Sequence, residues 1–477
     1  MRRRANPGAS HQPALPAFVM AMPLYPSKTI NVPDIFLAVF VFSTGFFIQC
    51  NVLTSNLGLR FLNITDMLVL MTLPVIALLY IRCLTPSILL FYLLPLTVFF
   101  AFTTLFADAR GEGEFYTTAM TYFYAVYFLF FTYMLFKENR LELFCWGIFA
   151  GFIAVTILLF LDVVIHDQLA SLGLSFMFDE AGVLELAAKG EITPLLLRVE
   201  KAGGIWPVGN TAGPVFALAG AAAAYLAERQ KRPALFAVFL LIYLASFTLT
   251  LNRSGVFAVL AIGLYFYVRN FSIKMLLSTY VGFALCALVI AAVLPLGAFD
   301  FAEQALSKRF LEDSNSSNNL QERWETITGG FQVMLQHPLG IGFTARYEEL
   351  ARISKIGTPH NGFMATSYAS GLGFCIMSAF ALFYAVFRNR KIGFFAYSAI
   401  GIIIGYQFEE LNFNPVFMAH VGLALAYAAI DLDFRLFLKN TMMRILGTAD
   451  TTRNREHGSV IGATHGPSPL FSDGRQS

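Results

Sequence analysis

The chain has 477 residues, of which 57% are hydrophobic and only 13% are charged, and its mean hydropathy is +0.64. Soluble domains have about 25% charged residues, so this composition excludes a water-soluble globular protein. The formal net charge of +3 says little by itself, and we expect no nucleic-acid partner. Several apolar runs reach the roughly 20 residues that a helix needs to cross a bilayer. Backbone groups in lipid must pair internally, so we predict an all-α integral membrane protein.

Residues 1–33 are proline-rich with a basic start and lack the apolar core of a cleaved signal, so we expect a cytoplasmic N-terminal tail. A polytopic membrane domain over 34–430 and a disordered cytoplasmic tail over 431–477 are predicted to follow. About twelve transmembrane helices are expected, at 34–53, 65–82, 86–107, 115–136, 143–165, 207–227, 234–250, 253–269, 275–296, 360–386, 392–408 and 414–430. The division between the seventh and eighth spans, at Leu251–Asn252, is the weakest of these.

The positions of the cations predict the orientation of these spans. With the N-terminus inside, each short inner loop carries at least one Lys or Arg, as the positive-inside rule requires. The inner cations are Arg82, Lys137, Arg140, Arg229, Lys231, Arg232, Arg269, Lys274, Arg388, Arg390 and Lys391, and the short outer loops contain only Arg60, Arg110 and Arg253. Both ends of the chain are therefore expected in the cytoplasm.

Two outer loops are long, one over 166–206 and one over 297–359 between spans nine and ten. The second loop is the longest polar segment between hydrophobic spans, and 301–311 and 319–336 both show helical periodicity. Asn319 and Glu322 resemble a capping box at the start of the second helix, and Pro338 with the following glycines should end it. We expect two short amphipathic helices on the outer membrane boundary, roofing a cavity between spans.

Three arginines on the outer side are candidates for binding phosphate. Arg253 stands at the mouth of the eighth span in TLNRSGVF, Arg198 precedes the turn into the sixth span, and Arg323 lies on the loop helix. A guanidinium group donates a planar fork of hydrogen bonds to phosphate oxygens and stays ionised when partly buried. The alternative is a solvated arginine whose stem lies along apolar surface.

His360, in TPHNGF at the start of the tenth span, is the candidate catalytic residue. A neutral imidazole at the membrane surface can take a proton from a hydroxyl, as a general base must. The alternative is a histidine that caps the helix start. His337 precedes Pro338 and is interpreted as a helix-end residue.

Other chemistries have weaker support. The five cysteines lie in or beside apolar runs without paired spacing, which indicates small buried residues rather than disulfides or metal ligands. The spans have few ionisable residues in their interiors, which argues against an ion-driven transporter. Asp108, Glu112 and Glu114 could hold a divalent cation, but solvated acids are the preferred interpretation, so no metal site and no cofactor is expected.

Taken together, these motifs resemble the O-antigen ligase and O-antigen (exopolysaccharide) polymerase superfamily of bacterial membrane glycosyltransferases. The resemblance covers about 200–425. It is carried by Arg198 with the Asn210 turn, by Asn252–Arg253–Ser254–Gly255, and by the late loop. In that loop Arg323 is followed by HPLGIGF at 337–343, by His360–Asn361 and by Gly371.

The resemblance implies transfer of a glycan from an undecaprenyl-diphosphate carrier at the periplasmic face of the bacterial inner membrane. The acceptor would be lipid A-core in a ligase or a lipid-linked glycan in a polymerase. In this family periplasmic arginines bind the donor diphosphate and a loop histidine activates the acceptor, without metal. Arg253 and His360 correspond to these residues, and Arg198 and Arg323 correspond less closely. The remaining alternatives are a lipid-linked oligosaccharide flippase and a metal-dependent glycosyltransferase using the acids at 108–114.

Overall fold

The computed structural model describes residues 34–50, 64–106, 112–171, 212–250, 252–270, 316–341, 361–388, 392–405 and 416–433, with single positions 277, 280, 281, 284 and 435. Every regular element in these ranges is a helix. Five helices are long and apolar enough to cross a membrane, and further apolar helices are shorter. The prediction of a helical membrane protein is confirmed, while the count of twelve spans stays a prediction.

The chain divides into two compact units, Met1–Ala429 and Ile430–Ser477, and the description below concerns the first. The main helices are α2 (Asp34–Gln49), α3 (Ile64–Tyr80), α5 (Leu94–Phe106), α6 (Glu112–Lys137), α7 (Leu141–Ser171), α10 (Ala212–Gln230), α11 (Ala234–Thr250), α12 (Arg253–Arg269), α15 (Ser316–Gln336), α17 (Gly362–Ser370), α18 (Leu372–Arg388) and α19 (Gly393–Gly405). A short 3-10 segment (Ile81–Cys83) follows α3, and α4 (Pro86–Ile88) with a π-helical turn (Leu89–Leu93) leads into α5. A last apolar helix spans Val416–Asp433.

The weakest predicted division is confirmed, because α11 ends at Thr250 and α12 begins at Arg253. Another prediction is wrong. The span expected over 360–386 is two helices, α17 and α18, which are separated at Gly371. The capping box is also misplaced, because α15 begins at Ser316 and Asn319 lies inside its first turn. The predicted helix 301–311 and span 275–296 lie outside the described residues, apart from single positions of the span.

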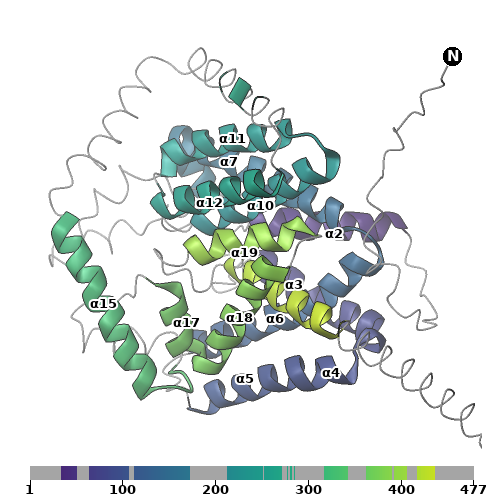
Figure 1. Cartoon of the computed structure of the whole chain (residues 1–477), viewed down its shortest axis with the longest axis vertical. Coiled ribbons are helices and arrows are strands. Elements are labelled where there is room, and N and C mark those ends of the chain that lie inside the picture. Colours follow the sequence, from purple (N-terminus) through teal and green to yellow (C-terminus); the bar gives the residue numbers. More distant parts are fainter. Residues whose placement is uncertain are drawn as a thin grey trace, which may run out of the picture. The chain divides into compact units, whose positions relative to one another are not determined.

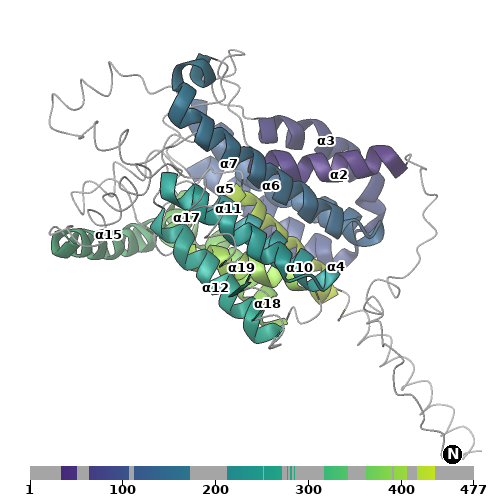
Figure 2. The same ribbon diagram turned by 90° about the horizontal axis from the view of Figure 1, so that it is seen from above.

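Helices α2 and α7 pack with their backbones in close approach. Gly45 of α2 faces the carbonyl group of Phe144, and a Cβ atom at Gly147 or Gly151 of α7 would meet the backbone of α2. Gly147 and Gly151 form a GxxxG pattern, which allows membrane helices to approach without side chains between them. Figure 2 shows α2 and α7 in the same group of helices, beside α3 and α6.

Helix α10 is the central helix of the second group, with α11, α12 and α19 around it (Figure 1). Its sequence AGPVFALAGAAAAYLAERQ is rich in Ala and Gly, and nearly all of it is buried. Small side chains let neighbours lie close: a Cβ at Gly220 would meet the ring of Phe239, and one at Gly401 of α19 would meet Ala217. A central helix built in this way places the starts of its neighbours at defined positions.

Polar contacts connect the helix ends on one side of the unit. Glu228 at the end of α10 lies 3.1 Å from Arg269 at the end of α12, and its other oxygen accepts a 2.9 Å hydrogen bond from Tyr397 near the start of α19. Arg140, just before α7, pairs with Asp34 at the start of α2. These contacts match the alternating helix directions that the cation pattern predicts.

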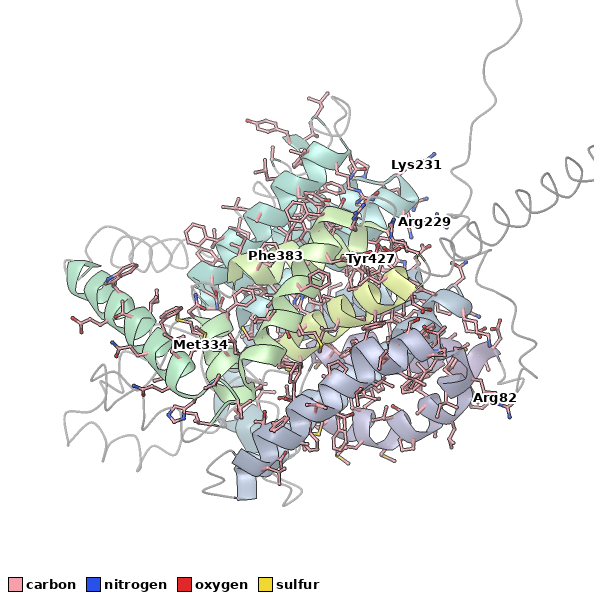
Figure 3. All side chains as sticks on the ribbon, turned by 60° about the horizontal axis from the view of Figure 1, so that its bottom comes forward. Arg82, Arg229, Lys231, Met334, Phe383 and Tyr427 are labelled. Carbon is pink, nitrogen blue, oxygen red and sulfur yellow. The ribbon has the colours of Figure 1, made fainter. Side chains whose placement is uncertain are left out.

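Figure 3 shows where the basic residues of the predicted inner loops lie. Arg82, Arg229 and Lys231 are all at one end of the unit, whereas Met334 of α15 is at the other. This separation supports the assignment of inner and outer loops. Which end faces the cytoplasm stays a prediction.

Four of the five cysteines belong to the described residues. Cys50, Cys145 and Cys375 are buried, Cys83 is half-buried, and all four are free thiols. Their interpretation as small apolar residues is confirmed for these positions, whereas Cys286 lies outside the described residues.

Candidate functional site

The mouth of α12, where the sequence places Arg253, is capped and tightly packed. Asn252 is the N-cap, and its Oδ1 accepts 2.7 Å hydrogen bonds from the Gly255 N–H and from the Ser254 hydroxyl. Asn252 and Ser254 are both buried. An Asn N-cap satisfies one of the amide groups that the first helical turn leaves free. The backbone of Arg253 is therefore fixed between two buried polar neighbours, while its side chain lies outside the described residues.

The start of α10 lies directly against this mouth. A Cβ atom at Gly213 would come within 2.7 Å of the Ser254 hydroxyl, and one at Gly255 would come within 2.8 Å of the Phe216 ring. A side chain at either position would force its neighbour, Ser254 or Phe216, to move. The start of α10, which follows Arg198 in the chain, thus packs against the start of α12, which carries Arg253.

A buried histidine that the sequence analysis does not identify lies in the helix Val416–Asp433 and contacts α10 and α19. His420 is fully buried. Its Nδ1 lies 2.6 Å from the Ser398 hydroxyl of α19, and its Nε2 lies 3.0 Å from the carbonyl oxygen of Pro214 in the first turn of α10. A titratable residue inside an apolar span is a strong signal for a polar site, and its place in the span 414–430 was available from the sequence.

The helix that follows His360 also begins with an asparagine cap. Asn361 accepts a 3.1 Å hydrogen bond at Oδ1 from the Met364 N–H, and α17 starts at Gly362. His360 precedes this cap by one residue and lies outside the described residues, as does Arg198. The two candidates that the sequence ranks highest, Arg253 and His360, therefore each adjoin an asparagine that starts a helix.

Helix α15 carries Arg323 and has three distinct faces. Trp324, Phe331 and Leu335 share one face and are 66%, 49% and 62% exposed. The buried face is formed by small or branched residues, Gly329, Gly330 and Val333. The exposed polar face carries Glu325, Thr328, Gln332 and Gln336. The expected helix with an apolar and a polar face is present as α15, whereas its place in an outer loop stays a prediction, and the side chain of Arg323 is not described.

A second buried polar contact at this end was also missed. Asp66, in the first turn of α3, is buried and accepts a 2.8 Å hydrogen bond from the Tyr124 hydroxyl of α6. Thr65 donates to the carbonyl oxygen of Phe47 at the end of α2, at 2.7 Å. Buried polar groups thus lie where α2 ends and where α3, α10 and α12 begin.

Most of the predicted site residues belong to, or adjoin, helices that the structure describes. Arg253 and Arg323 lie on helices, and His360 directly precedes one, so three of the four candidates are tied to described elements. No distance joins these side chains, and their convergence into one site stays a prediction. Glu112 and Glu114 lie in the first turn of α6, and their side chains are outside the described residues.

Comparison with known proteins adds one finding. Residues 236–374 match the family described as O-antigen ligase. No curated protein matches the chain. The matched segment runs from α11 through α12, α15 and α17 to the start of α18, and it contains Arg253, Arg323 and His360. The resemblance to the O-antigen ligase superfamily is confirmed over this segment, and it supports a membrane protein of polysaccharide biosynthesis with ligase- or polymerase-type function.

Proposed function

We propose that this chain, an O-antigen-ligase-like helical membrane protein, transfers a glycan from an undecaprenyl-diphosphate carrier to lipid A-core. The transfer takes place at the periplasmic face of the bacterial inner membrane. The observation that carries the proposal is the extent of the family match, 236–374, which spans both the capped mouth of α12 and the start of α17. Joining one lipid-linked repeat to another, as a polymerase does, uses the same donor and differs only in the acceptor.

The donor chemistry explains why arginines are needed. A glycosyl diphosphate leaves as an anion, so its departure requires positive charge at the phosphate oxygens. Arg253, with Arg198 and Arg323, supplies guanidinium groups that can bind these oxygens in pairs. The buried Asn252 and Ser254 side chains fix the backbone on both sides of Arg253, which keeps the position of the first of these groups constant.

The proposed bond changes are those of a direct displacement. The acceptor hydroxyl oxygen attacks the anomeric carbon of the donor, and the bond from that carbon to the phosphate oxygen breaks. His360 takes the hydroxyl proton, and undecaprenyl diphosphate leaves with the bonding electrons. Attack from the face opposite the leaving group inverts the configuration at the anomeric carbon. No residue in this scheme requires a metal ion.

Helix α15 would place this chemistry at the membrane surface. Its exposed face of Trp324, Phe331 and Leu335 suits the apolar side of the lipid-water boundary, and its polar face suits water. The lipid carrier and the acceptor are both anchored in lipid. Arg323, which is part of this helix, would therefore lie near the depth of the diphosphate group.

The test is glycan transfer in membranes that carry wild type, His360→Ala, Arg253→Ala or the control Arg388→Ala, with and without EDTA. Arg388 ends α18 on the predicted inner side, and its loss removes one cation without touching the site. We expect the His360 and Arg253 variants to lose transfer, and wild type and Arg388→Ala to keep it in EDTA. A single addition to lipid A-core supports the ligase, and a ladder of lipid-linked repeats supports the polymerase.

Two outcomes would contradict the proposal. If His360→Ala and Arg253→Ala insert normally and transfer at the wild-type rate, the site is wrong and a transport role gains support. If EDTA abolishes wild-type transfer, a metal site such as the acids at 108–114 must take part.

A further inference from the structure

The break between α17 and α18 is the place where the late loop is attached to the membrane helices. The turn that follows α15 contains Pro338 and Leu339, and the Pro338 carbonyl oxygen accepts a 2.8 Å hydrogen bond from the Leu372 N–H. Leu372 is the first residue of α18, so this bond satisfies an amide group that the new helix leaves free. The end of α15 and the end of α17 are thus fixed at one point.

Gly371 makes this attachment possible. Its backbone has φ +87° and ψ 153°, a combination that is essentially restricted to glycine. A Cβ atom there would also lie 2.9 Å from the carbonyl oxygen of Leu339. Both the conformation and the close approach exclude a side chain at this position.

Two hydroxyl groups from the scaffold complete the attachment. Thr103 near the end of α5 is fully buried, and its Oγ1 lies 3.2 Å from the Ser370 carbonyl oxygen and 3.4 Å from that of Leu339. The hydroxyl of Tyr122, on α6, lies 3.5 Å from the Ser370 carbonyl oxygen. Each hydroxyl has one proton, so the two together can donate to both carbonyl oxygens. We call Thr103, Tyr122, Gly371 and the Pro338–Leu339 turn the clasp.

Aromatic and glycine packing holds the scaffold side of the clasp in place. The ring of Tyr122 lies between those of Phe100 and Phe374, at centroid distances of 5.1 and 5.3 Å. Gly373, in the first turn of α18, faces the ring of Phe99 with no room for a Cβ atom. The clasp is therefore anchored on α5 and α6.

The C-terminal ends of α15 and α17 meet at the clasp (Figure 1). Arg323 precedes the end of α15 by 13 residues (323 to 336), which is about 20 Å at 1.5 Å per residue. Asn361, next to His360, precedes the end of α17 by nine residues, or about 14 Å. A small rotation at the clasp would therefore move both candidate residues by several times the displacement at the clasp itself.

The geometry points to Thr103, Tyr122 and Gly371 as positioning residues that set the separation between Arg323 and His360 through the clasp. This inference rests on the proposed function for its catalytic consequence. It assigns a role to α5 and α6, which lie outside the segment 236–374 that matches the ligase family. A misplacement of about 1 Å in a reacting group can cost about 100-fold in rate, so clasp variants should lower kcat without destroying the fold.

The first readout is transfer kinetics normalised to folded protein. Thr103→Val removes the hydroxyl and keeps the shape, and we expect kcat to fall about 10- to 100-fold. Thr103→Ser restores the hydroxyl and should restore most of kcat. The matched control is Thr104→Val on the same helix, whose hydroxyl donates within α5, to the Phe100 carbonyl oxygen at 2.7 Å. Gly371→Ala should lower kcat per folded protein in the same direction.

The second readout does not depend on catalysis. Spin labels at Glu325 on α15 and at Phe387 on α18, both exposed, report the distance between these two helices. Thr103→Val should broaden or shift the distance distribution, whereas Thr103→Ser and Thr104→Val should match wild type.

The outcomes separate the two proposals. An unchanged distance distribution in Thr103→Val overturns the clasp, whatever the activity. A changed distribution with wild-type kcat overturns its catalytic role. If wild type shows no transfer at all, the proposed function fails, and a changed distribution then supports only the attachment of the late loop.

Discussion

The Nε2 atom of His420 lies 3.0 Å from the carbonyl oxygen of Pro214. Since a carbonyl oxygen can only accept, the proton of a neutral ring is on Nε2, and Nδ1 accepts from the Ser398 hydroxyl at 2.6 Å. One imidazole thus joins α10, α19 and the helix Val416–Asp433. Both of its nitrogen atoms are paired, so His420 connects α10, whose start packs against the mouth of α12, with α19 and the last helix.

Ser398→Ala tests the energetic value of this connection. It leaves Nδ1 of a buried imidazole without a donor, and we expect a loss of about 1–3 kcal/mol in the free energy of unfolding. The matched control is Ser378→Ala on α18, because the Ser378 hydroxyl is equally buried and has no hydrogen-bond partner among the described residues. Thermal unfolding of the purified protein in detergent measures both. Equal stability of the two variants would mean that His420 does not stabilise this junction.

Gly147→Ala tests the close approach of α2 and α7. The added methyl group meets the carbonyl oxygen of Phe42, so the helices must separate and lose contacts along their length. We expect a loss of about 1–3 kcal/mol, as for overpacking in a dense core. Gly263→Ala on α12 is the control, because its methyl group would lie at an ordinary 3.7 Å from the Phe236 ring. Unfolding temperatures that fall equally would show that the loss does not come from the α2–α7 interface, because Gly→Ala by itself favours a helix.

The exposed apolar face of α15 predicts insertion into the membrane boundary. With Trp146 and Trp206 replaced by Phe, the fluorescence of Trp324 should be quenched by brominated lipid, because this side chain is 66% exposed on the apolar face. The control has Trp324→Phe with Glu325→Trp, which moves the indole to the polar face of the same helix. We expect little quenching there. Equal quenching of both positions, or of neither, would contradict an interfacial orientation.

His360 as a general base predicts the direction of the pH dependence. A base must be unprotonated to take the acceptor proton, so kcat should rise with pH through the range in which an imidazole loses its proton, and then level off. This limb should be absent from the residual activity of His360→Gln and present in His337→Gln, the control. A limb that survives in His360→Gln would assign the base to another residue.

The sequence predicts the helical membrane fold well because the signal is physical and local. Apolar runs near the length of a bilayer crossing must form helices in lipid, and the boundary at Asn252 is confirmed because an asparagine cap acts within four residues of chain. The amphipathic pattern of α15 is equally local. The motif around Arg253 likewise identifies the segment that the ligase family matches.

Contacts between distant segments are what the tertiary structure alone decided. Hydropathy makes 360–386 one span, yet the Pro338–Leu339 turn and Thr103 meet the chain at Gly371 and divide it. His420 has its role only because Pro214 and Ser398 lie beside it, from 206 and 22 residues away in sequence. Composition determines that these residues are in helices within a membrane, because transfer into lipid depends on each residue separately. Which polar groups meet inside the bundle depends on how the helices pack, and that is a property of pairs of residues far apart in the chain.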